Sequence, residues 1–170
     1  MFKKGFTLAE VLITLGIIGV VAAITLPSLN YNIANTTLEK QTLKFYNQLQ
    51  AAAKVALGQN PMGFTFDDAF IRRNFNVVNV CDNSNRANCL GSDLSAGSAK
   101  YKTLKSGTEI PVGDFFPTSR NIYVLADGAM FNVNSGSSES VVTFDVNGSA
   151  QPNTYGRDLW KITVFSDGSV

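Results

Sequence analysis

Three groups of side chains in this 170-residue chain have types and spacings that could do chemistry. Glu10 is the one charged residue in an apolar stretch that runs from Phe6 to Leu29. Cys81 and Cys89 lie close together in a polar segment. A third group offers side-chain oxygens within residues 145–158, and its members are Asp145, Asn147, Asn153 and Asp158.

The composition excludes several classes of enzyme. The chain contains no histidine, which is the commonest general base and a frequent zinc ligand, so neither a Ser/His/Asp triad nor a histidine metal site can be built. The sequence shows no other catalytic constellation, and we expect a protein that is not an enzyme. A net charge of +1, with no block of like charges, does not indicate a nucleic-acid partner.

The stretch around Glu10 predicts a membrane-spanning helix. No charged residue occurs from Val11 to Leu29, and a helix of this length crosses a hydrocarbon core of roughly 30 Å. An ionised carboxylate at the start of such a span is costly in lipid. Glu10 therefore needs a partner or a function, the alternative being that its side chain reaches back to water at the membrane surface.

The two cysteines predict a disulfide between Cys81 and Cys89. Two thiolates without further ligands make a poor metal site, so a metal pair is the weaker alternative. A disulfide implies an oxidising compartment.

The sequence predicts no cofactor, and calcium bound to the oxygen-rich segment is the alternative. Calcium takes about six to eight oxygen ligands, which the four side chains named above and nearby backbone carbonyls could supply. The interpretation that we favour is a turn in which Asn and Asp side chains bond their own backbone and glycines adopt positive φ. Both interpretations stay open at this point.

The elements that must position these residues follow from periodicity. Apolar residues recur at helical spacing beyond the span, which predicts one long helix from Phe6 to about Leu57. Its inward face is expected to hold Tyr31, Ala34, Leu38, Phe45, Leu49, Ala52 and Ala56. A short helix is predicted within residues 65–75, capped by Thr65 or Asp67, and residues 83–107 are predicted to form a loop.

The C-terminal third predicts a small antiparallel sheet. Alternating residues flank the Asp127-Gly128 turn and indicate a hairpin, and residues 141–146 and 159–165 add two strands. The expected fold class is α+β, with a long N-terminal helix packed on a small sheet.

The N-terminus resembles that of the type IV prepilin family, which includes pilins and the pseudopilins of type II secretion. The resemblance is carried by a basic pair, a glycine and an apolar helix with an early acid: Lys3, Lys4, Gly5 and then Phe6-Thr7-Leu8-Ala9-Glu10. It implies that a prepilin peptidase cuts between Gly5 and Phe6 and that Phe6 becomes the N-methylated terminus. The implied organisation is a leader at 1–5, a filament-core helix at 6–29, an amphipathic continuation at 30–57 and a globular head at 58–170.

The resemblance also implies partners and a location. Glu10 would meet the Phe6 amine of a neighbouring subunit, so that two groups costly in lipid neutralise one another during assembly. The chain would be a single-pass inner-membrane protein that enters a periplasmic or extracellular filament of pilin-like subunits through an assembly machinery. The alternatives are an uncleaved membrane-anchored receptor and a pilin specialised for DNA uptake or adhesion.

Overall fold

The computed structural model describes residue 5 and residues 7–59, 66–96, 100–136 and 138–170. The chain divides into two compact units, residues 1–37 and residues 38–170. Helix α1 (Leu8–Gln59) continues through Pro27 and contributes to both units. The expected α+β class is confirmed, because a long apolar helix is followed by a mostly antiparallel sheet in a pilin-like order.

Between Val11 and Leu29, in the N-terminal unit, α1 exposes apolar side chains on every side. The exposed fractions of its large apolar side chains run from 42% at Val11 to 78% at Leu8. The helix is long and apolar enough to cross a membrane. Such a surface is costly in water, so it needs lipid or protein to cover it.

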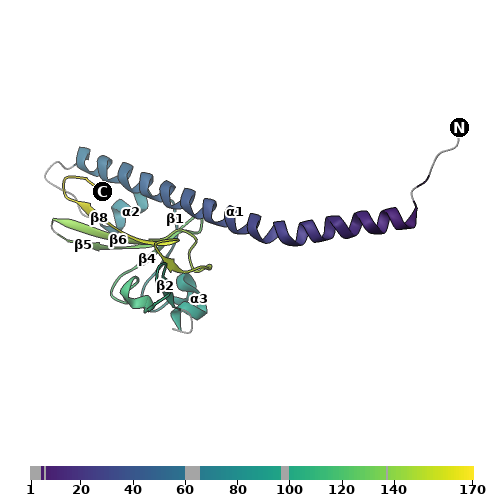
Figure 1. Cartoon of the computed structure of the whole chain (residues 1–170). Helices are drawn as coiled ribbons and strands as arrows, with labels where there is room; N and C mark the ends of the chain where they lie inside the picture. Colours follow the sequence, from purple (N-terminus) through teal and green to yellow (C-terminus); the bar gives the residue numbers. More distant parts are fainter. Residues whose placement is uncertain (1–4, 6, 60–65, 97–99, 137) are drawn as a thin grey trace. The chain divides into compact units, whose positions relative to one another are not determined.

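Figure 1 shows the sheet on which the C-terminal unit is built. It has eight strands in the order β1-β4-β5-β6-β8-β7-β2-β3. Strand β7 pairs in parallel with β2 and β8, and the other pairs are antiparallel. The strands are β1 (Val77–Cys81), β2 (Tyr101–Thr103), β3 (Glu109–Ile110), β4 (Ile122–Leu125), β5 (Met130–Ser135), β6 (Glu139–Asp145), β7 (Thr154–Tyr155) and β8 (Leu159–Phe165). The helical elements are α2 (Asp68–Asn74), α3 (Ala87–Ser95) and a 3-10 turn, η1 (Val112–Asp114).

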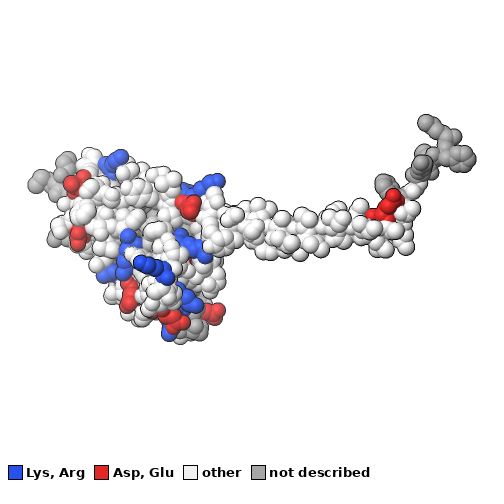
Figure 2. Space-filling model, in the orientation of Figure 1, with Lys and Arg blue, Asp and Glu red and all other residues white. Residues whose placement is uncertain are grey.

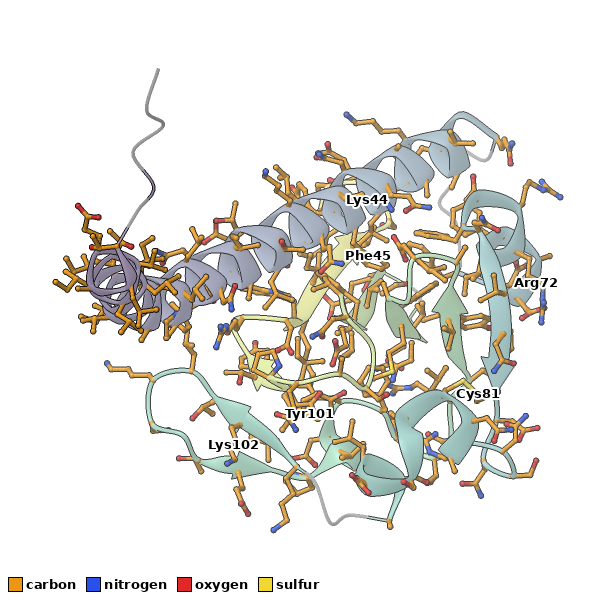
Figure 3. The ribbon with its side chains drawn as sticks, turned by 90° about the vertical axis from the view of Figure 1, so that its right-hand side faces the viewer. Lys44, Phe45, Arg72, Cys81, Tyr101 and Lys102 are labelled. Carbon is orange, nitrogen blue, oxygen red and sulfur yellow. A yellow bond between two sulfur atoms is a disulfide. The ribbon has the colours of Figure 1, made fainter. Side chains whose placement is uncertain are left out.

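The main core lies between the second half of α1 and the sheet. Phe45 points from α1 towards the strands (Figure 3) and is 3% exposed. Its ring stacks on Phe144 of β6 at 4.2 Å between centroids and lies 5.5 Å from the ring of Phe131 on β5. The inward face begins at Leu38, whereas Tyr31 and Ala34, predicted to lie on it, are exposed.

A second hydrophobic cluster lies around α3 and β2, which Figure 1 shows on the side of β4 away from α1. It joins α3, β2 and the segment after η1, and its members include Leu90, Leu94, Tyr101, Phe115 and Phe116. The loop predicted for residues 83–107 is therefore wrong in part, since it contains α3 and β2. The local sequence pattern does not predict these two elements, because Gly91 (φ 74°) interrupts α3 and because β2 has only three residues.

The remaining predicted elements are confirmed. Asp67 caps α2 by accepting a hydrogen bond from the Phe70 backbone N–H, and Thr65 lies outside the described residues. The predicted hairpin is β4–β5, with Gly128 at φ 90° in its turn. The two further predicted strands are β6 and β8, which pair with each other.

Candidate functional site

The N-terminal motif forms a capped helix start. Thr7 donates from its backbone N–H (2.8 Å) and its hydroxyl (2.9 Å) to Oε2 of Glu10. The Glu10 backbone N–H lies 3.3 Å from the Thr7 hydroxyl oxygen, which accepts from it. This reciprocal arrangement is a capping box. Gly5 is exposed, and Phe6, the predicted methylation site, lies outside the described residues.

The capping role of Thr7 is absent from the sequence interpretation above. Its signal is nevertheless present, because Thr7-Leu8-Ala9-Glu10 fits the pattern of Ser or Thr followed three residues later by Glu. The carboxylate of Glu10 thus has a partner within its own chain. Each carboxylate oxygen has two lone pairs, so Glu10 can still accept from a further donor.

The hydroxyl groups along the apolar stretch are satisfied by the helix itself. Thr14 donates to the Glu10 and Val11 carbonyls, Thr25 to the Val21 carbonyl and Ser28 to the Thr25 carbonyl. Helices that lie in lipid must satisfy polar groups internally, since the bilayer core offers no water. Figure 2 shows an uncharged surface along most of this stretch. These features suit inner-membrane anchoring.

The predicted disulfide between Cys81 and Cys89 is present. It joins the end of β1 to α3, and Figure 3 shows Cys81 at the sheet edge beside α3. Both cysteines are buried. The bridge therefore fastens the second cluster to the sheet.

The structure brings Asp145 and Asp158 into one buried network. Both residues are 0% exposed. Asp145 Oδ1 accepts from the Asn147 backbone N–H at 3.2 Å. The two oxygens of Asp158 accept from the Asn153 and Thr154 backbone N–H groups at 2.8 and 2.6 Å.

Tyr101 is a member of this network that sequence reasoning missed. Its hydroxyl donates to Asp145 Oδ2 at 3.1 Å across 44 positions of sequence, so no local pattern could reveal it. Burial raises the pKa of Asp145 well above its usual value, and the nearby charge of Asp158 raises it further. Burial also raises the pKa of Asp158.

Two amide oxygens of the same segment lack hydrogen-bond donors. Asn147 Oδ1 and Asn153 Oδ1 are buried without a partner among the described residues, and Asn153 is 2% exposed. Amide oxygens without donors are suited to bind a cation. The described residues contain no cluster of three or more His, Cys, Asp or Glu side chains, so a cation here would have two carboxylates.

Comparison with known proteins identifies the N-terminal motif. Residues 1–26 match the family described as the prokaryotic N-terminal methylation motif, which is the type IV prepilin cleavage motif. The match includes Gly5, Phe6 and Glu10. No curated protein and no solved structure was found to match the chain.

Proposed function

We propose that this chain is a structural subunit of a type IV-like filament, for type II secretion or for a pilus. A prepilin peptidase cuts between Gly5 and Phe6, Phe6 is N-methylated, and the subunit assembles through its N-terminal helix. The observation that carries the proposal is the match of residues 1–26 to the methylation motif. That motif indicates a structural subunit rather than an enzyme.

The surface of α1 supports assembly through this helix. Between Val11 and Leu29 it exposes apolar side chains on every side, and these need continuous cover. Membrane lipid supplies that cover before assembly, and the helices of neighbouring subunits supply it in a filament. The partners are therefore other pilin-like subunits, with the peptidase and an assembly machinery in the inner membrane. The disulfide supports a head outside the cytoplasm, because disulfides persist in oxidising compartments.

Glu10 has a specific task in this proposal. A terminal amine at Phe6 is largely protonated near neutral pH, since the unperturbed pKa of an α-amino group is about 7.7–8.0. Glu10 is the acid nearest to that amine in sequence. We expect the Thr7 cap to hold the carboxylate in a single subunit and the amine of a neighbour to bind it on docking.

Mass spectrometry of the native protein tests the maturation step. For the wild type we expect a chain that starts at N-methylated Phe6. A Gly5→Leu variant should keep residues 1–5, because the peptidase must bring the backbone close at this junction, where only a small side chain fits. Gly16→Leu is the matched control, since a Cβ there meets nothing within 4 Å and the position lies away from the cut. An intact N-terminus on the wild-type protein would favour an uncleaved membrane-anchored receptor instead.

A series at the capping box tests the role of Glu10. Glu10→Gln keeps a hydrogen-bond acceptor for Thr7 but removes the negative charge. Thr7→Ala removes the capping hydroxyl group but keeps the charge of Glu10. Glu10→Leu removes both the acceptor and the charge. We expect all three proteins to be inserted and cleaved, with sheared filaments falling sharply for both Glu10 variants and mildly for Thr7→Ala. Wild-type filament yield from Glu10→Gln would instead indicate a capping role, or a side chain that reaches water.

We also propose that residues 145–158 bind calcium. The support is the buried pair Asp145 and Asp158 together with the donor-free oxygens of Asn147 and Asn153. A cation would offset the negative charge of these two carboxylates, whose pKa values are raised by burial. Backbone carbonyls of the same segment would complete the oxygen ligands.

Calorimetric titration of the full chain in detergent with calcium chloride tests this second proposal. Saturable binding and a higher melting temperature are expected, both of them lost in Asp158→Asn. Asp167→Asn, which changes an exposed aspartate bonded to Ser169, serves as the control. If calcium produces neither heat nor a shift, the segment is a hydrogen-bonded turn, the other interpretation of its sequence.

A further inference from the structure

A cavity of about 360 Å³ lies in the C-terminal unit between α3 and the segment around η1. Its apolar wall is formed by Leu90, Leu94, Val112 and Phe116. Its polar lining consists of Asn83, Ser84, Arg86, Ser95 and Thr118. This volume is within the range of about 300–1,000 Å³ that is usual for small-molecule sites.

Arg86 is the charged member of this lining, and it is 9% exposed. Among the described residues no carboxylate forms an ion pair with it. The nearest acid in sequence, Asp82, is exposed and accepts hydrogen bonds from the Ser84 backbone and hydroxyl. A buried guanidinium without a counter-ion is unusual, because buried charges are normally paired.

The hydrogen bonds of Arg86 leave part of its guanidinium available. Nη1 donates to the Pro117 carbonyl at 3.0 Å and to the Arg120 carbonyl at 3.4 Å, and Nη2 donates to the Phe116 carbonyl. The Nε–H and the second Nη2–H have no acceptor among the described residues. In a guanidinium the Nε–H and the Nη2–H on the same side are parallel and match the two oxygens of a carboxylate.

From this geometry we infer that the cavity binds a small monocarboxylate with a short apolar chain. The carboxylate receives the Nε–H and Nη2–H of Arg86 and neutralises its charge. The apolar chain lies against Leu90, Leu94 and Val112. A neutral molecule of the same shape binds less well, because it leaves the buried charge unpaired.

Hexanoate is a suitable probe, with hexanamide as the neutral molecule of matched shape. Each is titrated into the full chain in detergent, and the methyl NMR signals of Leu90, Leu94 and Val112 report on binding. We expect saturable shifts with hexanoate and at least a tenfold weaker affinity for hexanamide. In Arg86→Gln that difference should disappear, while Lys102→Gln, which changes an exposed cation outside the cavity lining, should retain it.

A second variant keeps the test informative if Arg86→Gln fails to fold. Gly113 lines the cavity, and a Cβ there meets nothing within 4 Å, so we expect the tryptophan side chain of Gly113→Trp to occupy cavity space while Arg86 itself is kept. We expect Gly113→Trp to fold and to lose hexanoate binding. Equal titration by hexanoate and hexanamide, unsaturable shifts from partition into detergent, or binding retained in Gly113→Trp would each overturn the inference. None of these results depends on filament assembly.

Discussion

Phe45 is expected to be the main residue that holds α1 on the sheet. It is 3% exposed, and the rings of Phe75, Phe131 and Phe144 lie around it at centroid distances of 6.1, 5.5 and 4.2 Å. Replacing a buried phenylalanine by alanine costs about 3–5 kcal/mol. Because Phe131 and Phe144 project from paired central strands that cannot easily close the cavity, we expect about 4 kcal/mol for Phe45→Ala.

Urea unfolding of the full chain in detergent measures this loss. Trp160 is the single tryptophan and packs against the same core, so its fluorescence reports on the C-terminal unit. With a denaturant slope of about 2 kcal/mol/M, Phe45→Ala should lower the urea midpoint by about 2 M. Leu43→Ala is the control on the same helix: Leu43 is 59% exposed, and its replacement should change stability by no more than about 0.5 kcal/mol. Equal midpoints for the two variants would refute the assignment of this core.

Two further predictions concern the buried groups of the C-terminal unit. Because the folded-state pKa values of Asp145 and Asp158 are raised, their contribution to stability is complete below the unfolded value of about 3.9 and is lost as pH rises through the folded values. With divalent cations chelated, the contribution of these two groups to the unfolding free energy should therefore fall with rising pH above about 4. The free energy of the wild type should fall more, relative to that of Asp145→Asn, as the pH rises. The Cys81–Cys89 bridge should contribute about 2–3 kcal/mol, so reducing agent should lower the urea midpoint, and free-thiol labelling before reduction should find neither cysteine reactive.

The elements with a complete local signal could be predicted from the sequence. Strands β4, β5, β6 and β8 are runs of four to seven residues rich in β-branched, aromatic and other apolar side chains, and turn residues separate β4 from β5. Strands β2, β3 and β7 have three residues or fewer and form because other segments of the chain pair with them. A short stretch of sequence therefore does not predict them. The same reason hid Arg86, whose hydrogen-bond acceptors lie 30 or more positions away.

The two halves of α1 should respond differently to charge although they form one helix. Val20 is 62% exposed and Val55 is 48% exposed, so both side chains are accessible to solvent in the single subunit. In the proposed membrane setting, however, Val20 lies in hydrocarbon, where lysine near the centre of a helix costs roughly 2.5–3.5 kcal/mol. Val55 lies in the half of α1 whose other face is packed on the sheet, and a lysine there would meet water.

Fractionation of cells that express each variant measures this difference. Val55→Lys should stay in the membrane fraction after alkaline carbonate extraction at the wild-type level, whereas Val20→Lys should be partly extracted. The effect of placing a charge at an exposed apolar position of a helix thus depends on whether lipid or water surrounds that part of the helix. If both variants are retained equally, the proposal that residues 6–29 span a membrane is refuted, and the proposed route into a filament fails at its first step.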